Sequence, residues 1–199
     1  MIESLLLCSM QNSWTEIKNQ LEKISSTVAD SFNKPAGDEE IALLEMHLKQ
    51  SLPGFFKEYL KTFNGQLHNE FKLPFVGYNC LLSIAEIIDI YKRLLDLFGD
   101  EPKIDWVQEN KVQPVIWDKS WIPFTASETN TKIALDLNPG INGVYGQVIQ
   151  LWPGQDLEGD HIVIASSFEE FSEKILSYLK EKKYKLEEGK MTFTDNWII

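Results

Sequence analysis

Three carboxylates stand within five residues in one segment of this chain, at Asp156, Glu158 and Asp160. Oxygen ligands at alternate positions can bind calcium. The segment lacks the glycine and the distal glutamate of a helix-loop-helix calcium loop, however. We therefore favour an acidic surface loop, and the alternative is a hydrolase that uses these carboxylates with a bound cation.

The other reactive side chains do not form a catalytic pattern. The histidines His47, His68 and His161 lack the paired spacing of a metal-binding helix. Ser120 has no base near it in the sequence, and the chain contains no Gly-x-Ser-x-Gly elbow. The sequence thus predicts no enzyme, no metal and no cofactor.

The segment around three glycines predicts a hairpin rather than a phosphate site. Gly140, Gly143 and Gly146 precede a strand, so no helix N-terminus is aimed at a phosphate. Glycine instead allows the positive φ that tight turns need. For Asp136, just before this turn, we favour a turn-holding hydrogen bond over a role in binding.

Tryptophans lie on or near the predicted strands at Trp117, Trp121 and Trp152. Such a side chain is usually buried or half-buried with its N–H satisfied. The functional alternative is an exposed anchor in a protein interface, where tryptophan is enriched. We retain Trp117 and Trp152 as candidate anchors.

Composition and charge limit the classes of partner. The 199 residues suit one domain with appendages, and the net charge is 19 − 30 = −11. Nucleic-acid binding needs clustered Lys and Arg, so we expect no nucleic-acid partner. No segment is apolar enough to span a membrane. Without a basic signal-peptide segment, and with Cys8 and Cys80 far apart, we expect free thiols and a cytoplasmic location.

Five segments combine a helical spacing of apolar residues with a start signal. They begin at Ser13, near Asp38, at Pro53, at Ser83 and at Ser167. Strands are predicted at 71–76, 112–118, 121–125, 132–137, 144–152 and 161–165, with a last strand at 191–194. Because the first two segments contain proline, we expect them to form edge or irregular strands.

This order of elements predicts an α+β fold. We expect a mostly antiparallel, twisted sheet of about six strands, covered by helices on one side. The predicted division is an N-terminal helical extension at 1–34, an α+β domain at 35–183 and a C-terminal tail at 184–199.

A series of short motifs runs in order from about residue 35 to about residue 179. It comprises a glutamate before a Leu-Pro pair, an Asn-Gly stop, a Trp-Ile-Pro-Phe strand and a Gly-Gln-Val-Ile strand. The residues that carry it are Glu45, Pro53, Asn64, Gly65, Trp121, Pro123, Asp136, Gly146 and Gln147. The series resembles the SUKH superfamily, which includes the fungal Smi/Knr cell-wall-assembly regulators and many bacterial proteins. The chain departs from the family at Thr125–Thr131, where members often have a glycine-containing turn.

The resemblance implies a SUKH-like α+β domain without known catalysis. Bacterial members are associated with polymorphic toxin systems, as immunity proteins that neutralise a cognate toxin. The fungal branch regulates glucan synthesis through protein contacts. Our leading hypothesis is an immunity protein that occludes the active site of its toxin, and the alternative is a scaffold in wall or envelope synthesis.

The expected partner is a basic toxin domain, because complementary charge speeds the encounter of two proteins. The candidate contact residues combine acidic side chains with two tryptophans. They are Trp117, Asp118, Trp152, Asp156, Glu158 and Asp160.

Overall fold

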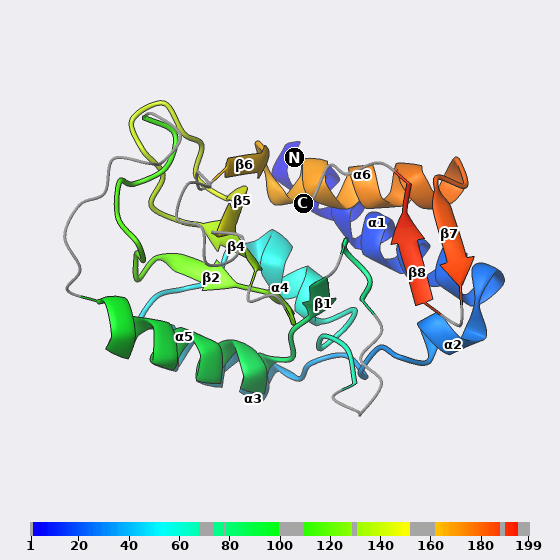
Figure 1. Ribbon diagram of the computed structural model, residues 1–199, viewed down its shortest axis with the longest axis horizontal. Coiled ribbons are helices and arrows are strands. Elements are labelled where there is room, and N and C mark those ends of the chain that lie inside the picture. The colour runs from blue at the N-terminus through cyan, green and yellow to red at the C-terminus, as the bar shows by residue number, and fades with distance from the viewer. Residues whose placement is uncertain are drawn as a thin grey trace.

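A four-stranded antiparallel sheet forms the centre of the protein (Figure 1). Its order is β2-β4-β5-β6, with β2 at Trp121–Pro123, β4 at Lys132–Asp136, β5 at Gln147–Leu151 and β6 at Ile162–Ala165. Every residue of β4 and β5 is buried, so both faces of these strands are covered. The computed structural model describes residues 2–67, 74–77, 79–99, 110–128, 131–151, 162–187 and 190–194.

Two antiparallel ribbons accompany this sheet. One pairs β1 (Asn79–Leu81) with β3 (Thr125–Ser127), and the other pairs β7 (Tyr184–Glu187) with β8 (Lys190–Phe193). Pairing changes at Phe124, whose N–H donates to Ile133 of β4 while its carbonyl accepts from Leu82, next to β1. The expected α+β class is confirmed, and the described strands divide between a sheet and two ribbons.

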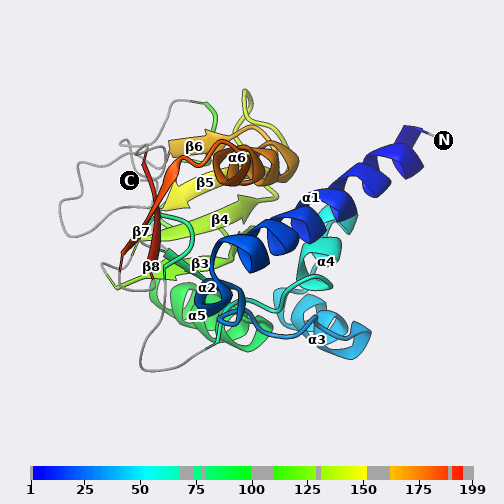
Figure 2. The same cartoon turned by 90° about the vertical axis from the view of Figure 1, so that its right-hand side faces the viewer.

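Two groups of helices pack against the sheet (Figure 2). Helices α1 (Ile2–Ile24), α4 (Gly54–Leu60) and α6 (Phe168–Lys180) pack on one another, and α6 contacts β5 and β6. Helix α5 (Ile84–Phe98) lies beside β2, and α3 (Asp38–Leu48) packs against α5. The short α2 (Ser26–Ala29) follows α1. Among the described residues, no helix has the length and apolar character needed to cross a membrane.

An aromatic cluster joins the three packed helices to the sheet. The ring of Trp14 lies 4.7 Å from that of Tyr59, and Phe168 lies 5.5 Å from both Tyr59 and Phe124. All four side chains are buried. Helix α1, which precedes residue 35, therefore contributes to the same core as the rest of the chain.

Two predicted helix starts are confirmed by their hydrogen bonds. The Ser83 hydroxyl accepts from the Glu86 N–H while the Glu86 carboxylate accepts from the Ser83 N–H, which is a capping box. The Ser167 hydroxyl accepts from the Glu170 N–H. Both caps lie within three residues of sequence, so the local chain determines them.

The predicted start at Ser13 is wrong. Helix α1 begins at Ile2 and continues through Ser13, because no glycine or proline interrupts the chain before Pro35. Helix α3 begins at Asp38, with Gly37 as its cap, and α4 begins one residue after Pro53.

The strand predictions fail where proline and tertiary contacts dominate. Residues 112–118 form a loop rather than a strand, since Pro114 has no N–H for a ladder. In 71–76, the first three residues lie outside the described chain, and Val76 makes only an isolated bridge to Asn79. The last strand is confirmed as β8, whereas β1 and β7 were not predicted.

Candidate interaction site

One buried carboxylate closes the hairpin between β4 and β5. Asp136 is fully buried, and its two oxygens accept from different donors. The Asn138 N–H donates to Oδ1 at 2.9 Å, and Gln147 Nε2 donates to Oδ2 at 2.7 Å. The Gly146 N–H also donates to the Asp136 carbonyl at 2.8 Å. Asp136 thus holds both ends of the turn.

The side-chain amide of Gln147 connects the Asp136 carboxylate to the rest of the hairpin. Its Oε1 accepts from the Val144 N–H at 3.1 Å. Its Nε2 donates to the Lys111 carbonyl at 2.8 Å as well as to Asp136. The amide is nearly fully buried, so its bonds are protected from water.

A strap formed by residues 110–113 crosses the hairpin. The Gly140 N–H donates to the Lys111 carbonyl at 3.0 Å, and the Asn142 N–H donates to the Asn110 carbonyl at 2.7 Å. Figure 1 shows this segment, which precedes β2, beside the turn at one corner of the molecule. The strap fixes a turn that a hairpin's own ladder would leave free.

Glycine is needed in the turn for two different reasons. Gly146 has a φ of 82°, and a Cβ there would stand 3.0 Å from the ring of Phe55. Gly143 does not have positive φ, but a Cβ there would stand 2.2 Å from the Lys111 carbonyl oxygen. The expected positive φ is therefore confirmed at Gly146, whereas Gly143 is needed for the close approach of the strap.

The outer part of the turn exposes apolar side chains. We call residues 138–146 the hairpin tip; they carry no charged side chain. Ile141 is 89% exposed, Val144 52% and Tyr145 58%. Neither the motif series nor the predicted contact residues include Ile141, Val144 or Tyr145. The available signal was three large apolar side chains within a segment of Asn, Pro and Gly, where a tight turn leaves them little to pack against.

Burial favours the protonated form of the Asp136 carboxyl. It raises the pKa of Asp136 from 3.8 to about 6, while the bonds from Gln147 and Asn138 lower it and the nearby Asp118 charge raises it. Four residues earlier in β4, burial and the charge of Arg93 lower the pKa of Lys132 to about 8. Neither group lies in a cluster that would bind a metal: no three His, Cys, Asp or Glu side chains converge in the described part of the chain.

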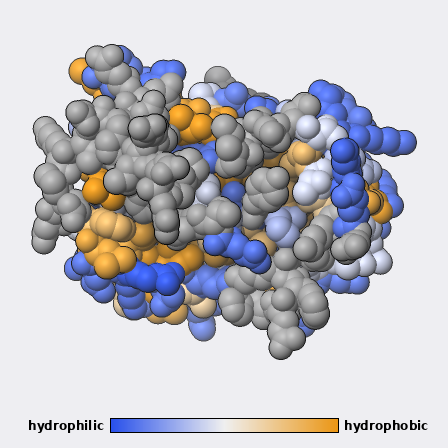
Figure 3. Space-filling model, viewed as in Figure 1, coloured by the Kyte–Doolittle hydropathy of each residue, from blue (hydrophilic) through white to orange (hydrophobic). Residues whose placement is uncertain are grey.

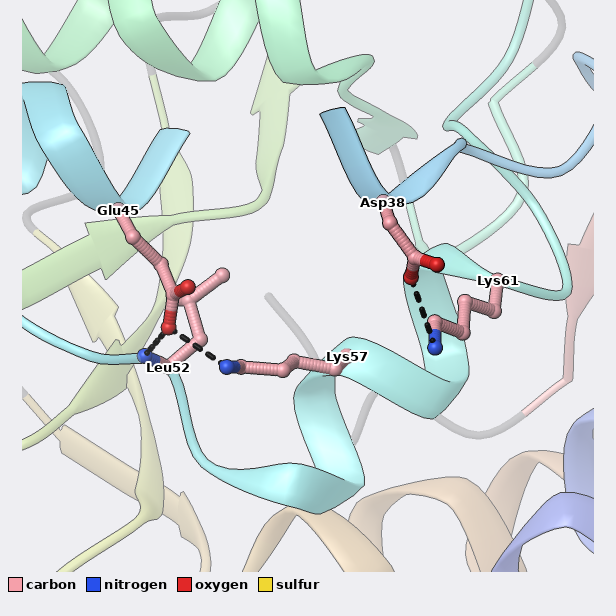
Figure 4. A network of polar contacts seen from close by, with 5 residues as sticks. All are labelled: Asp38, Glu45, Leu52, Lys57 and Lys61. Atoms are coloured by element: carbon pink, nitrogen blue, oxygen red, sulfur yellow. Dashed lines mark hydrogen bonds and ion pairs between the residues drawn. The ribbon is translucent and has the colours of Figure 1, made fainter. Parts of the chain in front are cut away.

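A second carboxylate holds the corner between α3 and α4 (Figure 4). Glu45 Oε1 accepts from the Leu52 N–H at 2.7 Å and pairs with Lys57 Nζ at 2.7 Å. Lys57 is the main cause that lowers the pKa of Glu45 below 4.5. Beside them, Asp38 pairs with Lys61 at 3.0 Å. Glu45 thus fixes the chain where it enters α4, immediately before Pro53.

The Asn-Gly pair after α4 links that helix to α5. Asn64 Oδ1 accepts from the Ile84 N–H at 2.7 Å, and Nδ2 donates to Glu40 Oε1 at 3.0 Å. Gly65 has a φ of 69°, and a Cβ there would stand 2.3 Å from the Leu82 carbonyl carbon. Asn64 and Gly65 therefore both hold the backbone in place between α4 and α5.

The predicted contact residues have different outcomes. Trp117 as an exposed anchor is wrong: it is 4% exposed, because its large ring packs against Tyr91 and Trp121 at 6.0 and 5.9 Å. Asp118 is half-buried, and its carboxylate accepts from the Ser120 N–H and the Asn138 amide. Four other predicted contact residues lie outside the described residues: Trp152, Asp156, Glu158 and Asp160.

Two strand residues of the motif series, Trp121 and Pro123, lie in β2 and are buried. Trp121 pairs with Asp136 across the ladder, and Asp136 pairs in turn with Gln147. Three strands thus bring motif residues from separate parts of the sequence to the base of one hairpin.

Comparison with known proteins agrees with this arrangement. The model of the SMI1 / KNR4 family (SUKH-1) matches residues 35–174. A Debaryomyces hansenii protein named KNR4/SMI1 homolog 2 is 25% identical over 224 residues, which cover 92% of this chain and 38% of that protein. The Saccharomyces cerevisiae cell wall assembly regulator SMI1 is 34% identical over 93 residues, covering 47% of this chain and 15% of that protein.

The chain spans less than two fifths of the length of either relative. The family match, by contrast, extends over most of the chain and includes the α3–α4 corner, the four-stranded sheet and the hairpin. This chain belongs to the SMI1 / KNR4 family (SUKH-1).

Proposed function

We propose that this protein is a binding module that acts on another protein by contact and not by catalysis. The observation that carries the proposal is the direction of the polar groups at the hairpin. Asp136 and Gln147 point inward and hold backbone, whereas the exposed tip presents Ile141, Val144 and Tyr145. A catalytic site needs polar groups that face a substrate, whereas large apolar and aromatic side chains commonly anchor protein-binding sites.

Within this class we favour neutralisation of a toxin by occlusion of its active site. The net charge of −11 supports a basic partner, because opposite net charges raise the rate of encounter. The family resemblance supports an immunity role for bacterial members. Neutralisation of this kind needs tight contact and no chemistry by the inhibitor.

The second candidate function is regulation of cell-wall assembly as a scaffold. It is favoured by a specific observation, namely that one relative is named as a cell wall assembly regulator. The match covers a small part of that relative, so what would be shared is a binding module. Its partners would be enzymes or signalling proteins of wall synthesis.

Binding and rescue assays with the products of neighbouring genes test the first candidate. The purified chain is mixed with each toxin candidate encoded beside it, and binding is measured by calorimetry. Rescue of growth in cells that express the toxin is scored in parallel. We expect one toxin to bind and to be neutralised. The wall-assembly function replaces the immunity function under two conditions. No toxin candidate binds and growth is not rescued, and deletion of the gene sensitises cells to wall-damaging agents.

A further inference from the structure

We infer that the hairpin tip is the contact surface of this protein, and that it inserts into an apolar pocket on a basic partner protein. The inference rests on the proposed function, because it names the surface and the partner chemistry of that binding module. Ile141 and Tyr145 are the expected anchors, with Val144 between them in sequence.

The tip is prepared for binding by its support. The strap bonds Gly140 and Asn142, while Gln147 bonds Val144 from below. Gln113 adds a bond from its Nε2 to the Pro139 carbonyl at 3.0 Å. A loop held in this way loses little conformational entropy when it binds, so more of the contact energy is kept as affinity.

The exposed side chains have the chemistry of an interface core. The side chain of Ile141 is 89% exposed, and Tyr145 combines an apolar ring with a hydroxyl that can donate a hydrogen bond. Figure 3 shows a small apolar (orange) area among hydrophilic (blue) atoms at the corner where the hairpin protrudes. Aromatic residues enclosed by a desolvated pocket supply much of the binding energy at protein interfaces.

Charge indicates what kind of protein carries the pocket. The tip is uncharged within a chain of net charge −11, and interface cores are depleted in charged residues. Lys111 bonds the tip through its backbone and Asp118 through its carboxylate, one of each sign. Long-range attraction therefore comes from the rest of the acidic chain, which favours a basic partner and disfavours an anionic membrane.

Shape excludes a symmetric pair of tips. A stable interface buries about 800 Å² on each partner, far more than three side chains at the end of a turn can supply when two such ends meet. A concave partner that encloses the tip can reach that area. We therefore commit to a pocketed partner protein as the occupant rather than to the tip of a second copy.

Photo-crosslinking in cells tests the inference. The variant Tyr145→p-benzoylphenylalanine places a crosslinker in the tip, and Met46→p-benzoylphenylalanine is the matched control on α3, where Met46 is 64% exposed. We expect Tyr145 alone to capture a basic protein. That protein is then purified and used as the probe, and Ile141→Asp is expected to weaken its binding at least about tenfold. Met46→Asp is expected to change binding less than about twofold.

Each other outcome overturns the inference. Capture at Met46 but not at Tyr145 leaves the proposed function standing and removes the tip as its surface. Capture at neither position counts against both. A crosslinked dimer of the chain would identify a second copy as the occupant. Sedimentation with vesicles of phosphatidylcholine and phosphatidylglycerol, abolished by Ile141→Asp, would identify a membrane instead. Unchanged folding of Ile141→Asp is checked by circular dichroism.

Discussion

The α3–α4 corner and the β4–β5 hairpin use the same device in opposite surroundings. In each, a carboxylate accepts a backbone N–H and fixes a change of chain direction. Glu45 keeps 24% of its side chain exposed and pairs with Lys57, which lowers its pKa. Asp136 is fully buried among neutral donors, and burial raises its pKa to about 6.

The difference teaches how much each region depends on its carboxylate. Water can replace part of what Glu45 does, since the corner is partly exposed. The side chains of Asp136 and Gln147 are buried from water, so the Gln147 amide needs its acceptors within the protein. The hairpin accepts an unfavourable buried charge to keep one backbone conformation, and that conformation is the one that presents the tip.

The largest expected effect compares a glycine at the far end of α4 with a glycine of the hairpin. Gly65→Ala should lower the free energy of unfolding by about 3–5 kcal/mol, because its Cβ would meet the Leu82 backbone at 2.3 Å and the φ is 69°. Gly146→Ala should cost about 1–2 kcal/mol, since its Cβ meets only the half-buried ring of Phe55. Urea unfolding measures the stability of both variants. Equal losses would show that the Phe55 ring moves aside no more easily than the Leu82 backbone.

The second comparison removes the two carboxylates. Asp136→Ala should cost about 2–4 kcal/mol, because the buried Gln147 amide keeps only the Lys111 carbonyl as an acceptor and the Asn138 N–H loses its bond to the carboxylate. Glu45→Ala should cost about 1 kcal/mol, with water taking its place at the Leu52 N–H. Both are measured by urea unfolding at neutral pH. A greater loss for Glu45→Ala would reverse our ranking of the two regions.

What the sequence could predict follows the range of the interactions. Caps at Ser83 and Ser167 depend on a partner three residues away, and both were predicted. Trp117 was misjudged because its neighbour Tyr91 lies 26 positions earlier, in another element. The motif series located Asp136 and Gln147, but the tip they support became evident only when the strap was placed across it.

The pH dependence of stability should have opposite signs in the two regions. Asp136 has a folded pKa of about 6 against an ordinary 3.8, so the folded state binds the extra proton. Its contribution to stability therefore falls as pH rises from about 4 to about 6. Glu45 has a lowered pKa, so its contribution is present above 4.5 and is lost as pH falls through the folded value.

Difference curves isolate these two terms from the other carboxylates. Stability is measured by urea unfolding from pH 3 to pH 7 for the wild type, Asp136→Asn and Glu45→Gln. We expect the wild type to lose stability relative to Asp136→Asn between about pH 4 and 6. It should gain relative to Glu45→Gln as pH rises through the acid range up to 4.5. Parallel curves for the wild type and Asp136→Asn would mean that Asp136 titrates normally.

The smallest effects lie in the ion pairs of the corner. Lys57→Gln should cost at most about 1 kcal/mol, since its pair with Glu45 is partly exposed at 33% and 24%. Lys61→Gln should cause no measurable change, because its partner Asp38 is 88% exposed. High salt separates the two roles of Glu45. The loss from Lys57→Gln should shrink as salt screens the pair, whereas most of the loss from Glu45→Ala should persist, because salt does not restore the carboxylate bond to the Leu52 N–H, which water replaces only in part. If both losses vanish together in high salt, the corner is held by charge, and its contrast with the hairpin is one of electrostatics rather than of backbone bonding.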